Sequence, residues 1–196
     1  MKKQDIVGRA ELKLAEAVQA FGYDFRGKNV LDIGSSTGGF TELALRLGAN
    51  KVYSVEKGTK QMKAPLRFDP RIVLMEKTDI FEVGKDQLIQ IPEEINTILA
   101  DVSFVSLASV LRHAKMALAG SNTDFLVMLK PQFEAYSEQL VNGVVKNERM
   151  RRDIIQSFER WLTKNGFLIL KKRDNELTGK NGNRERFYFL RLARSN

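Results

Sequence analysis

The sequence predicts an α/β fold with a seven-stranded, mostly parallel sheet that ends in a C-terminal antiparallel hairpin. Three observations predict it. Apolar β-type runs alternate with helical patterns, the first run breaks on a glycine-rich turn, and the last two runs are joined only by the turn-rich stretch Asp174–Arg184. Strands that alternate with helices form a parallel sheet with helices on both faces. Strands that follow each other through a turn pair antiparallel.

The individual elements follow from the spacing of apolar residues. Leu12, Ala15 and Val18 recur at helical spacing and predict an amino-terminal helix over about 9–21. The strands are predicted at Val30–Ile33, Val52–Val55, Ile72–Met75, Ile95–Ala100, Phe125–Leu129, Phe167–Lys171 and Phe187–Leu192. Further helices are predicted at about Thr41–Leu47, Lys60–Leu66, Leu107–Ala119 and Arg149–Asn165. The pattern of Gly84–Ile91 is ambiguous. The segment Gln132–Asn147 is a long connection after a strand, which is either a functional loop or an irregular surface loop.

Length and composition favour a single domain over residues 1–196 that needs neither disulfides nor a structural metal. The chain has no cysteine and one histidine, His113, which excludes Cys/His zinc sites and thiol nucleophiles, so no metal site is expected. No apolar run is long enough to span a bilayer, and the amino terminus lacks the apolar core of a signal peptide. We therefore expect a cytoplasmic protein without a membrane partner.

The net charge of +8 is concentrated in the carboxy-terminal part of the chain. Residues 1–145 hold 18 Lys and Arg against 18 Asp and Glu, whereas residues 146–196 hold 14 against 6. A local excess of basic groups suggests a surface that faces a polyanion, with nucleic acid as the first candidate. A solvated basic helix explains the same charge equally well.

The turn after the first strand is the strongest pointer to a ligand. An apolar strand that breaks on glycines and passes into a helix brings backbone N–H groups against a nucleotide-like molecule. Asp32 lies on the strand itself, and a negative charge there disfavours a pyrophosphate but suits the cationic sulfonium of S-adenosylmethionine. The candidate cofactor residues of this segment are Asp32, Gly34, Ser35, Ser36, Thr37, Gly38, Gly39 and Phe40.

Acidic residues at the ends of the next two strands extend the predicted cofactor site. Glu56 ends the second strand and could accept both ribose hydroxyls of a nucleoside; Asp79 follows the third and could accept from an adenine amino group. Their neighbours Lys57 and Ile80 are included in the predicted site. Strand capping and solubility are the alternative explanation of such acids. Seven strands with a terminal hairpin match the class I methyltransferase variant of the Rossmann-like sheet.

The residue types present narrow the atom that would receive a methyl group. Methylation of a pyrimidine carbon requires a cysteine, and the chain has none. Methylation of an exocyclic amine usually shows an Asn/Asp-Pro-Pro-aromatic segment after the fourth strand, where this chain has Asp101-Val102-Ser103-Phe104. An oxygen nucleophile, or a small molecule, remains.

Several segments in consistent order resemble a known family. They are Gly8–Leu14, Leu31–Thr41, Asp101–Phe104, Leu129-Lys130-Pro131-Gln132-Phe133-Glu134 and Gly182-Asn183-Arg184-Glu185. The chain resembles the TlyA family of haemolysin-named rRNA methyltransferases, within the wider FtsJ-like 2′-O-methyltransferases. The resemblance implies methylation of a ribose 2′-hydroxyl of ribosomal RNA, at cytidine, with S-adenosylmethionine as cofactor. It also implies a Lys-Asp-Lys-Glu tetrad, carried here by Lys13, Asp101, Lys130 and Glu185, with Asp101 also in the cofactor site.

The tetrad chemistry is physically reasonable. A 2′-hydroxyl is a very weak acid, so Lys130 would take or direct its proton as the methyl arrives. Lys13 would disfavour the ammonium form of Lys130 by like-charge repulsion, whereas Asp101 and Glu185 would orient the two amines.

The resemblance also sets expectations about partners and leaves two alternatives open. Family members usually carry a small RNA-binding domain ahead of the methyltransferase, which this chain is expected to lack, so ribosomal RNA or ribosomal subunits would bind through the basic region 146–196. One alternative is an RNA-binding or ribosome-assembly module that retains cofactor affinity without activity. The other is a membrane-active protein, suggested only by the haemolysin name.

Overall fold

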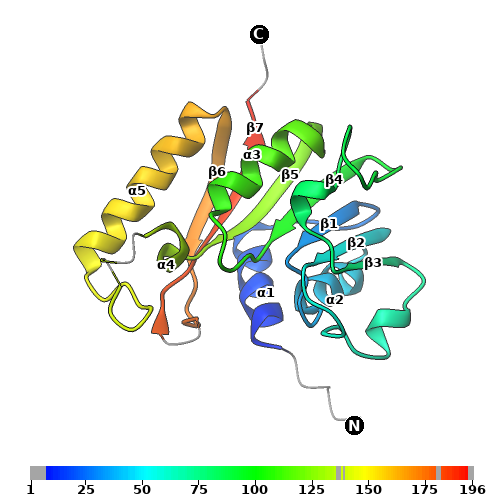
Figure 1. Ribbon diagram of the computed structural model, residues 1–196, viewed down its shortest axis with the longest axis horizontal. Coiled ribbons are helices and arrows are strands. Elements are labelled where there is room, and N and C mark those ends of the chain that lie inside the picture. The colour runs from blue at the N-terminus through cyan, green and yellow to red at the C-terminus, as the bar shows by residue number, and fades with distance from the viewer. Residues whose placement is uncertain (1–7, 136–137, 139, 180–181, 194–196) are drawn as a thin grey trace.

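The computed structural model describes residues 8–135, 138, 140–179 and 182–193. Seven strands form one sheet in the order β3-β2-β1-β4-β5-β7-β6 (Figure 1). The strands are β1 (Asn29–Ile33), β2 (Lys51–Glu56), β3 (Ile72–Glu76), β4 (Ile95–Ala100), β5 (Ala119–Leu129), β6 (Phe167–Asp174) and β7 (Arg186–Leu192). The first five pair in parallel, and β7 lies antiparallel between β5 and β6. The predicted fold class and the antiparallel carboxy-terminal hairpin are therefore confirmed.

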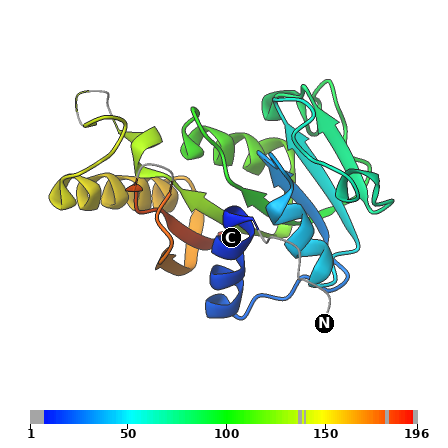
Figure 2. The same ribbon diagram turned by 90° about the horizontal axis from the view of Figure 1, so that it is seen from below.

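Helices cover both faces of the sheet (Figures 1 and 2). α1 (Arg9–Phe21) and α2 (Gly39–Arg46) pack on one face, and α3 (Leu107–Ala117) and α5 (Glu148–Lys164) on the other, with the short α4 (Pro131–Glu134) after β5. Each face has its own apolar core, because side chains alternate between the two faces of a strand: one forms around Leu14 and Phe40, the other around Leu111 and Phe158. The central strands of the sheet are thus buried between two helical layers, whereas the edge strands β3 and β6 are partly exposed.

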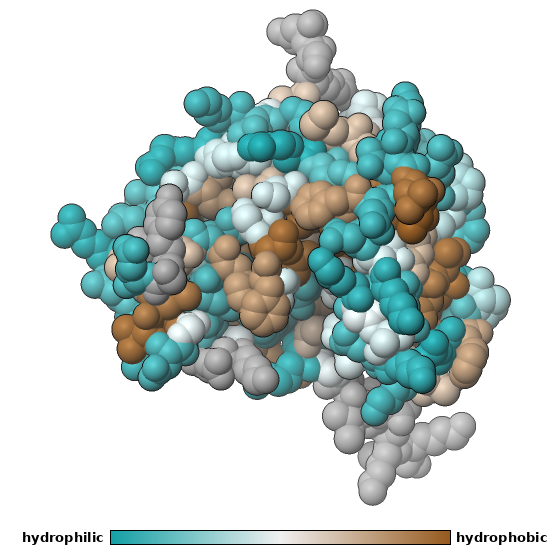
Figure 3. All heavy atoms as spheres, in the orientation of Figure 1, coloured by the Kyte–Doolittle hydropathy of each residue, from teal (hydrophilic) through white to brown (hydrophobic). Residues whose placement is uncertain are grey.

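The order of the strands places a crevice between β1 and β4. From β1 the chain proceeds through β2 to β3 on one side, and then returns to add β4 and β5 on the other side of β1. Ligands of open α/β sheets bind at the carboxyl ends of the strands where the strand order reverses in this way. On the face of the molecule seen in Figure 1, the space-filling view shows apolar side chains in the middle, bordered by hydrophilic ones (Figure 3).

The predicted helix over Lys60–Leu66 is wrong. Residues 57–65 form turns and bends, followed only by a 3-10 turn over Leu66–Phe68. Lys60 has a φ of 57°, which lies outside the right-handed helical region, and Pro65 has no backbone N–H to donate. Met62 is buried beneath the glycine turn instead. The tertiary contact therefore outweighs the local helical pattern.

Two smaller differences concern element boundaries and the ambiguous segment. The segment Gly84–Ile91 is neither helix nor strand and contributes one isolated bridge between Val83 and Ile89. The predicted helix Leu107–Ala119 ends at Ala117, because Ala119 already pairs with Ile95 as the first residue of β5.

Candidate active site

A cavity of about 690 Å³ lies at the carboxyl ends of β1, β2 and β4, where the strand order reverses. Of the residues predicted to bind the cofactor, Gly34, Ser36, Glu56, Lys57, Asp79, Ile80 and Asp101 line this cavity. Asp32, Ser35, Thr37, Gly38, Gly39 and Phe40 do not line it. The acids at successive strand ends thus lie around one cavity, whereas much of the glycine turn lies behind its wall.

Glu56 is held by the glycine turn and by the start of the β2–β3 connection. Its Oε2 accepts from the backbone N–H of Ser36 at 2.9 Å, and its Oε1 accepts from the N–H of Gly58 at 2.6 Å and from Gln61 Nε2 at 3.2 Å. Gln61 also accepts from the Ser36 hydroxyl at 2.9 Å. Sequence patterns do not single out Gln61, because they predict a helix for its segment. The Glu56 carboxylate is therefore fixed in orientation at the cavity wall.

Asp79 and Lys57 form an ion pair on the cavity wall. Lys57 Nζ donates to Asp79 Oδ2 at 2.9 Å, and the other carboxylate oxygen accepts from the backbone N–H of Phe81 at 3.2 Å. The hydrogen bond from Lys57 lowers the pKa of Asp79 below its usual range. Asp79 is consequently an ionised acceptor at neutral pH, as its predicted contact with an amino group requires.

Asp32 is fully buried behind the glycine turn. Its Oδ2 accepts from the Thr41 hydroxyl of α2 at 2.7 Å, and its Oδ1 has no hydrogen-bond partner among the described residues. Burial raises the pKa of Asp32 to about 7, although the hydrogen bond from Thr41 opposes the shift. The structure thus places this carboxyl between β1 and α2, away from the cavity lining.

The titration of Asp32 leads to a prediction about stability. The pKa of Asp32 is about 7 in the folded protein and 3.8 ordinarily. Between these two pH values the folded protein keeps the Asp32 carboxyl protonated, whereas the unfolded chain has released the proton. The stability contributed by this carboxyl is therefore lost as pH rises towards and through about 7. We expect Asp32→Asn to remove that loss, so that urea denaturation at acidic and mildly alkaline pH shows the variant gaining stability relative to the wild type as pH rises. A constant difference would contradict the shift.

The glycines of the turn serve close packing. Gly34 has a φ of 81°, and a Cβ on it would lie 2.8 Å from the backbone oxygen of Asp101. A Cβ on Gly38 would clash with Leu66 Cδ2, and one on Gly39 would lie 3.1 Å from the backbone nitrogen of Glu11 in α1. The turn therefore contacts β4, the β2–β3 connection and α1 at once.

The four residues of the predicted tetrad form two ion pairs. Lys130 Nζ lies 2.6 Å from Asp101 Oδ1 and donates to the Ser103 hydroxyl at 3.0 Å. Lys13 Nζ lies 2.5 Å from Glu185 Oε2, and both of these side chains are buried.

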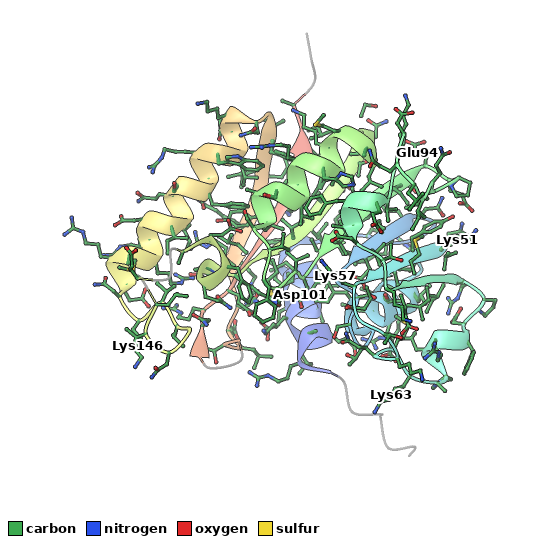
Figure 4. The ribbon with its side chains drawn as sticks, in the orientation of Figure 1. Lys51, Lys57, Lys63, Glu94, Asp101 and Lys146 are labelled. Carbon is green, nitrogen blue, oxygen red and sulfur yellow. The ribbon has the colours of Figure 1, made fainter. Side chains whose placement is uncertain are left out.

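The strand register explains why these residues meet. Leu129 pairs with Arg186 as the last antiparallel pair of β5 and β7, so Lys130 and Glu185 are the next residues along the two neighbouring strands. Asp101 follows the end of β4, which pairs with β5 on its other side. Asp101 also lines the cavity, and Figure 4 shows it with Lys57 at the centre of this face. The ion-pair cluster and the cavity thus share a wall.

Two aromatic side chains beside Lys130 belong to segments that carry the family resemblance, but the sequence predicts no role for them in the site. The Phe104 side chain lines the cavity, is 93% exposed, and has its ring centroid 5.1 Å from that of Phe133. The Phe133 centroid lies 5.9 Å from Lys130 Nζ. The only sequence signal for such a role is the position of Phe104, which is the last residue of the segment Asp101–Phe104 that follows the fourth predicted strand. An exposed large apolar side chain at a polar site offers a stacking surface for a planar group.

Many of the basic residues of 146–196 are engaged by carboxylates. Ion pairs join Arg151 and Arg186 to Asp174, Lys172 and Arg186 to Glu159, Arg173 to Glu176, Arg184 to Glu148, and Arg191 to Asp124. Lys146, Arg149 and Arg152 are exposed and have no carboxylate partner within the described part of the chain. We call these three residues, at and just before the start of α5, the α5 basic cluster.

Within the described residues, no helix is both long and apolar enough to cross a membrane. The same part of the chain holds no group of three or more His, Asp or Glu side chains placed to bind a metal ion.

Comparison with known proteins yields consistent matches. A family model described as FtsJ-like methyltransferase matches residues 6–192. The chain is 35% identical over 186 residues to the 16S/23S rRNA (cytidine-2′-O)-methyltransferase TlyA of Mycobacterium tuberculosis, covering 94% of this chain and 68% of TlyA. It is 34% identical over 180 residues to YqxC of Bacillus subtilis, which carries an rRNA methyltransferase name, covering 91% of this chain and 63% of YqxC. The chain therefore spans less than two thirds of the length of YqxC.

A solved structure shows the same relationship. A Streptococcus thermophilus protein with a hemolysin name superimposes with a TM-score of 0.90 at 30% sequence identity, over 99% of this chain and 70% of that one.

Proposed function

The chain belongs to the FtsJ-like methyltransferase family, and from this premise we propose that it transfers the methyl group of S-adenosylmethionine to a ribose 2′-hydroxyl of ribosomal RNA. The membership confirms the resemblance predicted from the motifs. One observation carries the proposal: the Lys130–Asp101 ion pair lies at the wall of a cavity whose other walls carry Glu56 and Asp79. In this proposal Lys130 handles the proton beside a cavity that holds the cofactor.

The cavity residues fit S-adenosylmethionine. Glu56 presents a fixed carboxylate suited to the two ribose hydroxyls, and Asp79 is an ionised acceptor suited to an adenine amino group. Gly34 lines the cavity, and the absence of a side chain there lets the turn pack against the backbone of Asp101, which lines the same cavity. When bound, the cofactor supplies an electrophilic methyl group. The remainder of the glycine turn, including Asp32, lies behind this wall, so the cavity lining does not support direct contacts between these residues and the cofactor.

The chemistry needed from the protein is positioning and proton handling. A bound cofactor would supply the methyl group by cleavage of its carbon–sulfur bond, and the ribose hydroxyl would lose its proton as its oxygen takes that methyl group. In the proposed mechanism the Lys130 amine, in its neutral form, takes that proton and becomes an ammonium group, and Asp101 and Ser103 hold the nitrogen in place. Phe104 and Phe133 form a platform on which the base of the target nucleotide would stack. A cytidine target is proposed because that nucleoside is named for TlyA.

The proposed RNA path crosses the face that carries the cavity. Lys146 and Lys63 lie on opposite sides of Asp101 in Figure 4. The α5 basic cluster would bind phosphates on one side, and the exposed Lys60 and Lys63 of the β2–β3 connection would bind them on the other. The proposed RNA surface thus uses only the α5 basic cluster from the basic region 146–196. It also includes Lys60 and Lys63, which lie outside that region.

The proposed function is tested by following a radiolabelled methyl group from S-adenosylmethionine into ribosomal RNA or isolated subunits, with nucleoside analysis of the product. Ribose-methylated cytidine is the expected product. A methyl group found on a base would contradict the proposal. Cofactor binding by calorimetry without transfer to any ribosomal substrate would support the inactive RNA-binding module instead.

A second prediction concerns the proposed RNA surface. Reversing two charges in the α5 basic cluster, Arg149→Glu with Arg152→Glu, should weaken RNA binding. The slope of log K against log salt should become shallower by about 1 for each phosphate that the variant no longer binds. The matched control is Lys164→Glu at the other end of the same helix, whose side chain is also exposed. Equal effects of the two changes would mean that binding depends on overall charge and not on this cluster.

A further inference from the structure

The first turns of α5 carry several cations, although cations usually stabilise the C-terminal end of a helix. The helix begins Glu148-Arg149-Met150-Arg151-Arg152, so it places cations at the end where the helix dipole already contributes positive charge. Arg149 and Arg152 are exposed and belong to the α5 basic cluster. Arg151, however, is only 5% exposed. A buried guanidinium is costly unless it is well paired, so its position calls for a specific role.

Arg151 is bonded to the residue before Glu185. Its Nε donates to the backbone oxygen of Arg184 at 3.2 Å, and its terminal nitrogen donates to Asp174 Oδ1 at 2.8 Å. The guanidinium thus links the first part of α5 to the end of β6 and to the segment that leads into β7.

Asp174 extends the contact to the residue after Glu185. Its carboxylate accepts from Arg186 Nε at 2.6 Å and from a terminal nitrogen of Arg186 at 3.1 Å. Burial alone would raise the pKa of Asp174, but the hydrogen bonds from Arg186 and Arg151 lower it to about 2. Asp174 therefore remains ionised over the whole neutral range and bridges the two guanidinium groups.

The backbone of Glu185 is fixed at the same place. Its carbonyl oxygen accepts from the N–H of Asn175, the neighbour of Asp174, at 3.0 Å. Contacts from Arg151 and Asp174 hold the residues on either side, and the Glu185 carboxylate itself accepts from Lys13 Nζ. The backbone that carries this carboxylate is thus held from both sides by groups connected to Arg151.

We propose that Arg151 is a positioning residue for methyl transfer, which acts by holding the backbone on both sides of Glu185 through the Arg184 carbonyl and Asp174. The inference rests on the proposed function, because it gives Glu185 its part in the tetrad. It assigns a role to a basic residue of the 146–196 region that is buried and outside the proposed RNA surface. Arg151 touches neither the cavity nor Lys130 among the described residues.

The first test compares Arg151→Met with Arg151→Lys and with the control Lys172→Met. Lys172 pairs with Glu159 in the same ionic network but does not contact the segment around Glu185. We expect Arg151→Met to lower kcat on the order of 10²-fold, since small displacements of reacting groups have effects of this size. The affinities for S-adenosylmethionine and RNA should be unchanged, Arg151→Lys should restore part of kcat, and Lys172→Met should retain it. Unchanged kcat in Arg151→Met would overturn the inference.

A double substitution separates positioning from a general loss of structure. If Arg151 acts only through Glu185, then Arg151→Met should cause no further loss of kcat in a Glu185→Gln background. A loss that multiplies with that of Glu185→Gln would show that Arg151 acts elsewhere, and would overturn the inference.

The last measurement does not depend on activity. Hydrogen exchange at the Asn175 amide, which donates to the Glu185 carbonyl, should become faster in Arg151→Met and in Arg151→Lys to a smaller degree, but not in Lys172→Met. Unchanged exchange in Arg151→Met would overturn the inference even if the wild type methylates no RNA. An inactive wild type would instead refute the proposed function.

Discussion

Replacing Lys130 with alanine is expected to lower kcat for methyl transfer by about 10²- to 10⁴-fold, the range found when a group that handles the reacting proton is removed. The affinity for S-adenosylmethionine should stay close to that of the wild type. The reason is positional: Lys130 follows β5 and lies outside the cavity lining, where it contacts Asp101 and Ser103. Single-turnover rates and calorimetric cofactor binding provide the two measurements.

Two further variants sharpen this prediction. Lys115→Ala removes an exposed lysine of α3 whose amine donates to the backbone oxygen of Asn165, so it should leave both quantities unchanged. Asp101→Asn should lower both, because Asp101 contacts Lys130 and also lines the cavity. A parallel fall of kcat and cofactor affinity in Lys130→Ala would contradict the separation of the two roles.

Replacing Lys13 with methionine is expected to lower the free energy of unfolding by about 3–5 kcal/mol, the usual cost of leaving one partner of a buried ion pair uncompensated. The side chains of Lys13 and Glu185 are 9% and 4% exposed, and their charged atoms lie 2.5 Å apart. In Lys13→Met the carboxylate of Glu185 would lose that partner in a poorly hydrated site. Chemical denaturation gives the free energy of unfolding directly.

The matched comparisons are an exposed pair and a double variant. Lys57→Met breaks the pair with Asp79, in which the Lys57 side chain is 82% exposed, and should change the free energy of unfolding far less, because solvent screens an exposed ion pair. Lys13→Met combined with Glu185→Gln removes both charges and should recover most of the stability, but no activity. A Lys13→Met variant as stable as Lys57→Met would show that the buried pair contributes little.

The candidate cofactor cavity is largely predictable from the sequence because its geometry follows from the fold class. Parallel strands bring their carboxyl ends to one edge, so Glu56, Asp79 and Asp101 can be expected together once their strands are located. The glycine turn is located in the same way. Its individual residues are not separable by sequence, since spacing alone does not distinguish Gly34, which lines the cavity, from Gly39, which packs against α1.

The features that the sequence does not predict depend on contacts between distant segments. The stretch 60–66 has a helical pattern, but the burial of Met62 under the glycine turn depends on a neighbour far away in the chain. For this reason the sequence does not predict that Gln61 lies at the cavity wall. The charge of 146–196 can be counted, but the pairing of Arg151 and Arg186 with Asp174 depends on the β6–β7 hairpin and on the packing of α5. Composition locates charge, whereas only the fold shows which charges remain exposed.

The packing of Gly39 against α1 changes how substitutions in the glycine-rich turn should be interpreted in mutational scans. A Cβ on Gly39 would press on the backbone of Glu11, two residues before Lys13, so this position sets the spacing between two helices. An alanine at this position would require the helix that carries a lysine of the proposed tetrad to shift by a few tenths of an ångström, although Gly39 itself does not line the cavity. Loss of activity after such a change would therefore report on helix spacing, even though the altered residue belongs to the motif by which nucleoside-binding proteins are recognised.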